Sequence, residues 1–138
     1  MSRLIDADAP DNFSKHITGT PDNASISFNT NQSLDDLRDE IYQDAVAHGL
    51  WEGAEYETSA QMGAEMYCAA HRIGDEVREL KDEAVRACRG EQHGYSEELA
   101  DVIIMALSIA GHFGIDIDDE IRRKMAINKE RPWKRGKK

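Results

Sequence analysis

The apolar residues of this chain recur at helical spacing from Ser33 onward, and before Ser33 they follow no sustained period. Residues 1–32 are rich in Asp, Asn, Ser and Thr and contain two prolines, a composition typical of irregular chain. Within them, residues 25–28 alternate as a short edge strand does. The first 32 residues therefore predict an irregular N-terminal arm ahead of a helical domain.

The helical part divides at glycines that follow the apolar stripes. Ser33 is a good N-cap for the first helix, Ser96 for the third, and Pro132 requires the last helix to end before it. The predicted helices span about residues 34–48, 59–87, 97–113 and 118–131. The expected fold class is all-α, an antiparallel bundle of about four helices per chain.

The predicted third helix is apolar around most of its circumference. No charged residue occurs from Val102 to Ile115, and the polar positions before and within this run form a narrow wedge that includes Glu98, Asp101 and His112. A helix of this kind has to be surrounded by other helices, and a chain of 138 residues supplies few of them. We therefore expect a homo-oligomer, a dimer or a tetramer, in which the chains share the bundle core.

Charge divides the chain into an acidic body and a basic end. From Arg122 to Lys138 there are nine Lys and Arg residues against the single acid Glu130, so the net charge of −10 leaves about −18 on residues 1–121. The longest uncharged stretch is 14 residues, shorter than a membrane span, and the first residues lack the features of a signal peptide. These properties predict a soluble cytoplasmic protein without a membrane partner, in which Cys68 and Cys88 are reduced thiols in or near the core.

Two pairs of acidic residues lie at the edge of apolar stripes. Glu76 and Glu79, in "EVRE", are three residues apart on the second predicted helix, and Glu98 and Asp101, in "ELAD", are three apart on the third. Residues at this spacing share a helix face, where like charges repel each other. If the two helices face each other, four carboxylates converge on hard cations such as Mg²⁺ or Mn²⁺, which prefer oxygen ligands.

Other interpretations of these residues remain open. In a chain with 27 acidic residues, acid pairs at this spacing also arise by chance, and they can be ordinary surface acids. A set of two cysteines and two histidines superficially resembles a zinc site, although two of the four would lie in mid-helix. Those residues are Cys68, His71, Cys88 and His93.

The acid pairs and the basic end together resemble a known family. "GDEVREL", then "EELADVII" and then "KMAINKERPWKRGKK" are similar to the MazG-like, all-α nucleoside triphosphate pyrophosphohydrolases, over roughly residues 60–138. Eighteen residues separate Glu79 from Glu98. The chain departs from the family pattern at Arg135, where the family often has His.

The resemblance implies both a reaction and a set of site residues. Members of this family bind Mg²⁺ through the acid motifs and hold a triphosphate with a downstream Lys, Asn and Arg. The implied metal ligands are Glu76, Glu79, Glu98 and Asp101, the implied phosphate contacts are Lys124, Asn128 and Arg131, and Glu76 or Glu79 is the expected catalytic base. The implied reaction is hydrolysis of a (deoxy)nucleoside triphosphate between the α- and β-phosphates.

A second function is compatible with the basic end. Residues 132–138 form a basic tail beyond the domain of residues 33–131, and a non-catalytic helical protein could use such a tail to bind nucleic acid. The acidic body argues against this alternative, because it repels nucleic acid everywhere except at the tail. We therefore expect a nucleotide substrate rather than a nucleic-acid partner. Trp51, Tyr56 and Tyr95 are candidates for stacking on the nucleobase, although packing is the commoner role of such residues.

Overall fold

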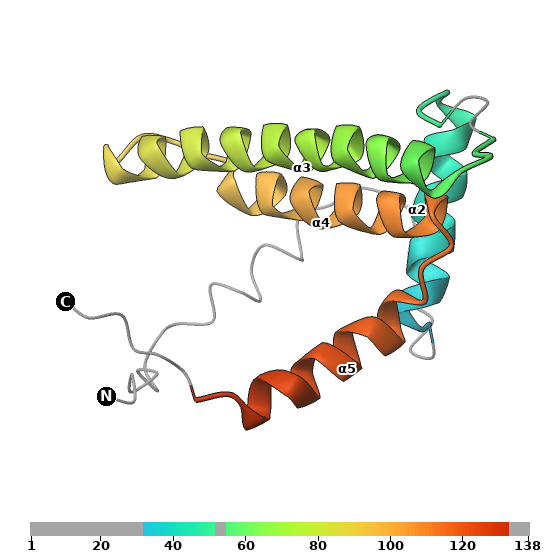
Figure 1. Ribbon diagram of the computed structural model, residues 1–138. Coiled ribbons are helices and arrows are strands. Elements are labelled where there is room, and N and C mark those ends of the chain that lie inside the picture. Colours follow the sequence, from blue (N-terminus) through green and yellow to red (C-terminus); the bar gives the residue numbers. More distant parts are fainter. Residues whose placement is uncertain (1–31, 52–54, 133–138) are drawn as a thin grey trace. The chain divides into compact units, whose positions relative to one another are not determined.

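The computed structural model describes residues 32–51 and 55–132 and shows four helices (Figure 1). These are α2 (Leu34–Ala47), α3 (Ser59–Cys88), α4 (Tyr95–His112) and α5 (Ile117–Glu130). No strand occurs among the described residues, so the all-α prediction is confirmed. The strand expected at residues 25–28 and most of the basic tail lie outside the described residues.

Local sequence explains where most of the helices begin and end. Ser33 caps α2 and Thr58 caps α3, and in both cases the residue three positions later completes a capping box. Gly90 and Gly114 follow the ends of α3 and α4 with φ angles of 72° and 63°, a left-handed conformation that glycine adopts without strain. The predicted cap at Ser96 is wrong, because α4 begins at Tyr95 after Gly94, which has no side chain to cap it.

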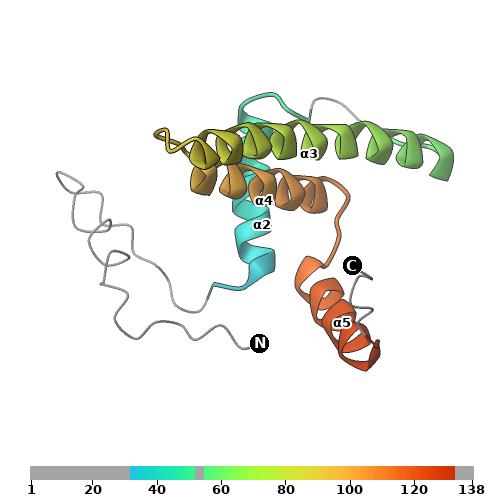
Figure 2. The same cartoon turned by 90° about the vertical axis from the view of Figure 1, so that its left-hand side faces the viewer.

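α3 and α4 lie side by side and antiparallel, and α2 crosses them near the C-terminal end of α4 (Figures 1 and 2). α5 departs from α4 at a bend of 114°, and its main helix contact is with α2. Arg38 and Asp35 on α2 hold this bend: the Arg38 guanidinium donates to the Ile115 carbonyl, and Asp35 accepts from the Asp118 backbone N–H at 3.3 Å. The direction of α5 is therefore set from α2.

The core of the described region is small and lies where α2, α3 and α4 meet. Trp51, Ala69 and Ile109 are its buried centre, and the Trp51 indole N–H donates to the Ser108 hydroxyl at 2.8 Å. The His112 ring stacks on Trp51 with ring centroids 4.1 Å apart, and the Arg72 guanidinium lies 5.0 Å from the centre of the Trp51 ring. Trp51 is 8% exposed and thus packs the core instead of offering a face to a nucleobase.

α4 is the most apolar helix, and one chain covers only part of it. Residues 107–110 near its C-terminal end are buried, whereas Leu99, Ile103 and Ile104 are 49%, 52% and 46% exposed. Among the described residues, no single helix is long and apolar enough to cross a membrane. Only α4 and α5 taken together have the length and composition of a membrane span, and they are bent by 114°. One chain therefore leaves these apolar side chains of α4 uncovered.

Both cysteines differ from expectation in their exposure. Cys68 and Cys88 are free thiols, but both side chains are exposed and neither belongs to the core. Helix phase explains the difference, because Cys68 precedes the buried Ala69 by one residue and so points about 100° away from it.

Replacing Gly74 by alanine should stabilise the protein. Gly74 lies within α3, and a Cβ added there meets no atom within 4 Å. Since glycine in a helix interior costs about 0.5–1 kcal/mol relative to alanine, we expect Gly74→Ala to raise the free energy of unfolding by about that amount. Chemical denaturation measures it, and an unchanged or lower midpoint would show that another chain occupies this face of α3.

Candidate functional site

A polar seam runs between α3 and α4. On α3, Glu76, Glu79 and Glu83 follow one another at spacings of three and four, so they share one face. On α4, Glu98 and Asp101 share a face in the same way, and the antiparallel packing sets the two faces against each other. The convergence expected from the two acid motifs therefore occurs along this seam.

Three of the four predicted ligands come together. Glu76, Glu98 and Asp101 each place one carboxylate oxygen within 4.8 Å of the oxygens of the other two. Glu76 and Glu98 are half-buried and Asp101 is exposed, so the group opens to solvent on one side. Such a group can accept a cation that keeps part of its coordination free for a substrate.

The electrostatics of this group favour a bound cation. Burial raises the pKa of Glu98, and the charges of Glu79 and Asp101 raise it further. Burial likewise raises the pKa of Glu76, followed by the charges of Glu79 and Asp101. Within the described residues, the buried Oε2 of Glu98 has no hydrogen-bond partner. A divalent cation would offset the repulsion among the carboxylates and give the buried Glu98 oxygen a partner. The residues present therefore fit the predicted metal.

Glu79 lies beside this group but not in it. Its carboxylate is exposed and is close enough to raise the pKa of both Glu76 and Glu98, but none of its oxygens belongs to the three-carboxylate set. Asp75, which precedes the same motif, pairs with Arg78 at 3.4 Å on the exposed side of α3. Glu79 is thus an exposed carboxylate next to the candidate metal ligands.

The predicted phosphate contacts lie elsewhere in this chain. Lys124 and Asn128 are on α5, and Arg131 follows its end. α5 diverges from the α3/α4 pair in both views (Figures 1 and 2), and its main helix contact is with α2. Within one chain, therefore, the structure gathers the acidic half of the predicted site but does not bring the basic half to it.

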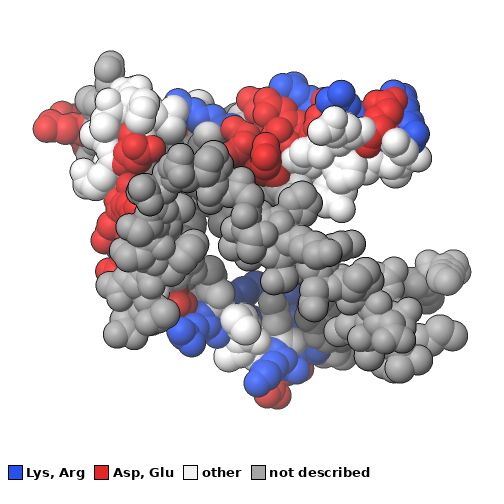
Figure 3. Space-filling model, turned by 180° about the vertical axis from the view of Figure 1, so that it is seen from behind, with Lys and Arg blue, Asp and Glu red and all other residues white. Residues whose placement is uncertain are grey.

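Charge is separated over the surface in the same way. In Figure 3, acidic side chains, mixed with basic ones, lie on the upper part of the molecule, whereas the part at the bottom shows mostly Lys and Arg. α5 carries acids in its first turn and basic residues after it. A metal-bound polyphosphate has to meet both kinds of surface, since its cation needs carboxylates and its phosphate oxygens need basic groups.

The seam ends in an aromatic cluster that the sequence did not reveal. The Tyr56 hydroxyl and His112 Nε2 share a hydrogen bond of 2.7 Å. Burial lowers the pKa of His112, and the nearby charge of Arg72 lowers it further against the opposing effect of Glu65. His112 therefore packs within the bundle, stacked on Trp51 and hydrogen-bonded to Tyr56. No local motif joins Tyr56 to His112, since the two are 56 residues apart.

The alternative zinc set does not assemble. Among residues 32–51 and 55–132, the one group of three or more Asp, Glu, Cys and His side chains close enough to hold an ion is Glu76, Glu98 and Asp101. Cys68 and Cys88 belong to no such group, so within the described residues the carboxylates are the candidate metal centre.

Comparisons with known proteins cover the residues of this candidate site. The profile of the MazG-like family matches residues 75–138, a range that includes all seven predicted site residues. A dATP/dGTP diphosphohydrolase of Cyanophage S-2L is 33% identical over 84 residues, which cover 56% of this chain and 80% of that relative. No solved structure matches the chain significantly.

Proposed function

This chain belongs to the MazG-like family and is a nucleotide pyrophosphohydrolase, and we propose that it hydrolyses (deoxy)nucleoside triphosphates at the α–β bond with Mg²⁺ as cofactor. The observation that carries this proposal is the convergence of the carboxylates of Glu76, Glu98 and Asp101 to within 4.8 Å. The relative from Cyanophage S-2L, which acts on dATP and dGTP, makes purine deoxynucleotides the first substrates to test. Cytoplasmic localisation remains a prediction.

The three converging carboxylates would hold the metal, and Glu79 is the proposed base. When bound, Mg²⁺ supplies positive charge that offsets the charge of the phosphate oxygens and acidifies a coordinated water; Mn²⁺ can do the same. Glu79 then accepts a proton from the attacking water, whose oxygen bonds to the α-phosphorus. The bond from that phosphorus to the α–β bridging oxygen breaks, so that the nucleoside monophosphate and pyrophosphate leave. Glu76 would be the alternative base.

Lys124, Asn128 and Arg131 are the proposed phosphate contacts, and a second copy of the chain is the proposed way to bring them to the acids. The bend at Ile115 is held to α2 by Arg38, which directs α5 away from its own α3/α4 pair. The exposed apolar side chains of α4 are a surface on which copies can pack. We propose a homodimer or homotetramer in which α5 of one copy faces the acids of another.

A nucleotide panel tests the proposed function. Purified protein is incubated with each canonical (d)NTP in the presence and absence of Mg²⁺, and the products are separated by anion-exchange chromatography. We expect monophosphate and pyrophosphate in equal amounts, only with Mg²⁺ or Mn²⁺. Release of orthophosphate and diphosphate from every active substrate would overturn the proposed bond.

Mixing two inactive variants tests whether α5 acts on another copy. Glu98→Gln removes a metal ligand and Lys124→Ala removes a phosphate contact, so each variant alone should lose most activity. If the acids and α5 of one site come from different chains, oligomers that contain both variants keep some intact sites. We therefore expect activity to return after the two are unfolded and refolded together. Activity that stays at the level of the separate variants, despite mixed oligomers detected by native mass spectrometry, would place both halves of the site in one chain.

A further inference from the structure

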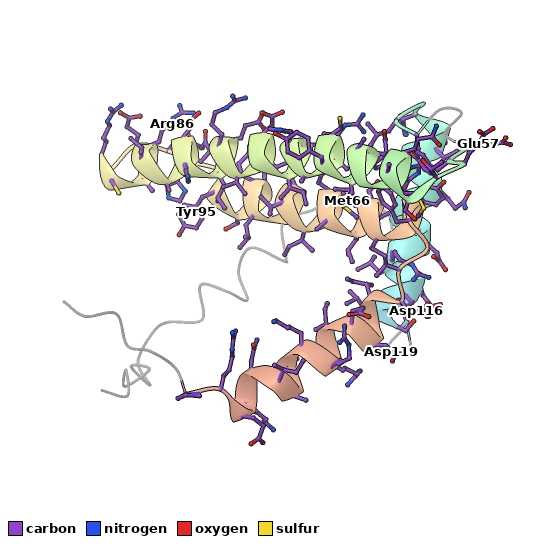
Figure 4. All side chains as sticks on the ribbon, in the orientation of Figure 1. Glu57, Met66, Arg86, Tyr95, Asp116 and Asp119 are labelled. Atoms are coloured by element: carbon purple, nitrogen blue, oxygen red, sulfur yellow. The ribbon has the colours of Figure 1, made fainter. Side chains whose placement is uncertain are left out.

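The turn between α3 and α4 is held by a contact that no capping motif predicts. Glu83, on α3, accepts a hydrogen bond from the Gly94 backbone N–H at 2.6 Å through Oε2. Its other oxygen accepts from Arg86 Nη1 at 3.1 Å, and Arg86 also pairs with Glu91 at 3.6 Å. Arg86 and Tyr95 mark this end of the two helices in Figure 4. We call this set the Glu83 brace.

The brace acts where α4 begins. Gly94 is the N-cap of α4 and has no side chain to cap the helix. Glu83 of α3 accepts from the Gly94 backbone N–H, the donor that the N3 side chain satisfies in a capping box. The Gly94 carbonyl accepts from the N–H groups of Glu97 and Glu98, at 3.0 and 3.1 Å. Gly94 therefore contacts Glu83 through its N–H and the first turn of α4, which carries the candidate ligand Glu98, through its carbonyl.

Glu83 is unlike the candidate ligands in its environment. Its side chain is 19% exposed, and both of its oxygens already have donors, whereas Glu98 has a buried oxygen without a partner in the described region. The Gly94 N–H lowers the pKa of Glu83, and Arg86 lowers it further, while the pKa of Glu98 is raised. Glu83 thus stays ionised, and the surrounding donors already satisfy it.

We propose that Glu83 is a positioning residue of the active site: by accepting the Gly94 N–H it fixes the start of α4 relative to α3, and so the spacing of Glu98 from Glu76. This proposal rests on the proposed function, because it concerns the metal site of that reaction. Glu83 lies one turn beyond Glu79 on the same face of α3. The geometry assigns it to the backbone of α4.

The substitutions Glu83→Gln and Glu83→Ala separate a positioning role of Glu83 from a role as a charged metal ligand. Glutamine keeps an oxygen acceptor for the Gly94 N–H but loses the charge, whereas alanine loses both. We expect Gln to retain Mn²⁺ affinity and kcat within about threefold of the wild-type values. Ala should lower both by about 10- to 100-fold, the range typical of residues that orient metal ligands. Asp82→Ala, the neighbouring exposed acid on α3, is the matched control and should change neither.

Amide hydrogen exchange of Gly94, followed by NMR without metal or substrate, provides the second measurement. The Gly94 N–H should exchange slowly in the wild type and in Glu83→Gln, and at least tenfold faster in Glu83→Ala. If Ala fails to fold, Glu83→Asp, whose side chain is too short to reach, takes its place. Equal losses of Mn²⁺ affinity in Gln and Ala, or unchanged Gly94 exchange in Ala, would overturn the proposal. Because amide exchange is measured without substrate, it tests whether Glu83 holds the Gly94 N–H even if the protein releases no pyrophosphate.

Discussion

Glu98→Gln should abolish most pyrophosphate release and, without metal, should stabilise the fold. Glu98 is half-buried beside Glu76 and Asp101, and its Oε2 has no partner among the described residues. Loss of one carboxylate ligand should lower kcat/KM by at least about a hundredfold, the upper end of what removing an orienting residue costs. Since the folded state disfavours ionised Glu98, the neutral amide should raise the melting temperature of the metal-free protein.

The stability half of this prediction separates a metal site from a chance cluster. Mg²⁺ should raise the melting temperature of the wild type and leave that of Glu98→Gln nearly unchanged, because only a fold that binds the ion is stabilised by it. Glu97→Gln, the neighbouring exposed acid in the same turn, is the control and should keep the Mg²⁺ effect. A wild type whose melting temperature ignores Mg²⁺ at millimolar concentration would contradict the metal assignment.

Gly111→Ala should destabilise the protein strongly. Gly111 lies in α4 where α2 crosses it, and an added Cβ would lie 2.5 Å from Tyr42 Cβ and 2.9 Å from Tyr42 Cγ. These atoms adjoin the α2 backbone, so rotating the Tyr42 side chain cannot remove the clash, and α2 has to move. Overpacking of this kind costs about 1–3 kcal/mol, more than the alanine gains in helix propensity.

Thermal unfolding compares this variant with Gly74→Ala, the same substitution at a helix position with open space. We expect opposite signs, a lower melting temperature for Gly111→Ala and a higher one for Gly74→Ala. If both variants are stabilised, α2 does not cross α4 at Gly111 as described.

The sequence predicted the helices and the shared helix face of each acid pair because both depend on local spacing. Helical periodicity and stop glycines placed four helices within a few residues of their observed ends, and the i,i+3 spacing placed Glu76 and Glu79 on one face of a helix. The sequence placed the start of α4 two residues late, and it did not reveal the contact at this start, because Glu83 is eleven residues before Gly94 and on another helix.

The relation between α5 and the rest of the site was beyond sequence reasoning for the same reason. The spacing of Lys124 and Asn128 shows that they share a face of α5, but not where α5 points. Its direction depends on Arg38, whose contact with Ile115 spans 77 residues. The family motif joins acids and basic residues in one reaction without stating whether they come from one chain or from two.

Hydrolysis in ¹⁸O-labelled water tests the central claim most directly. The protein is incubated with dATP or dGTP, Mg²⁺ and H₂¹⁸O, and both products are analysed by mass spectrometry. Attack at the α-phosphorus predicts one ¹⁸O atom in the nucleoside monophosphate and none in the pyrophosphate, with turnover by Glu98→Gln lower by at least about a hundredfold. Label in pyrophosphate or orthophosphate, or equal turnover by Glu98→Gln, would contradict the account.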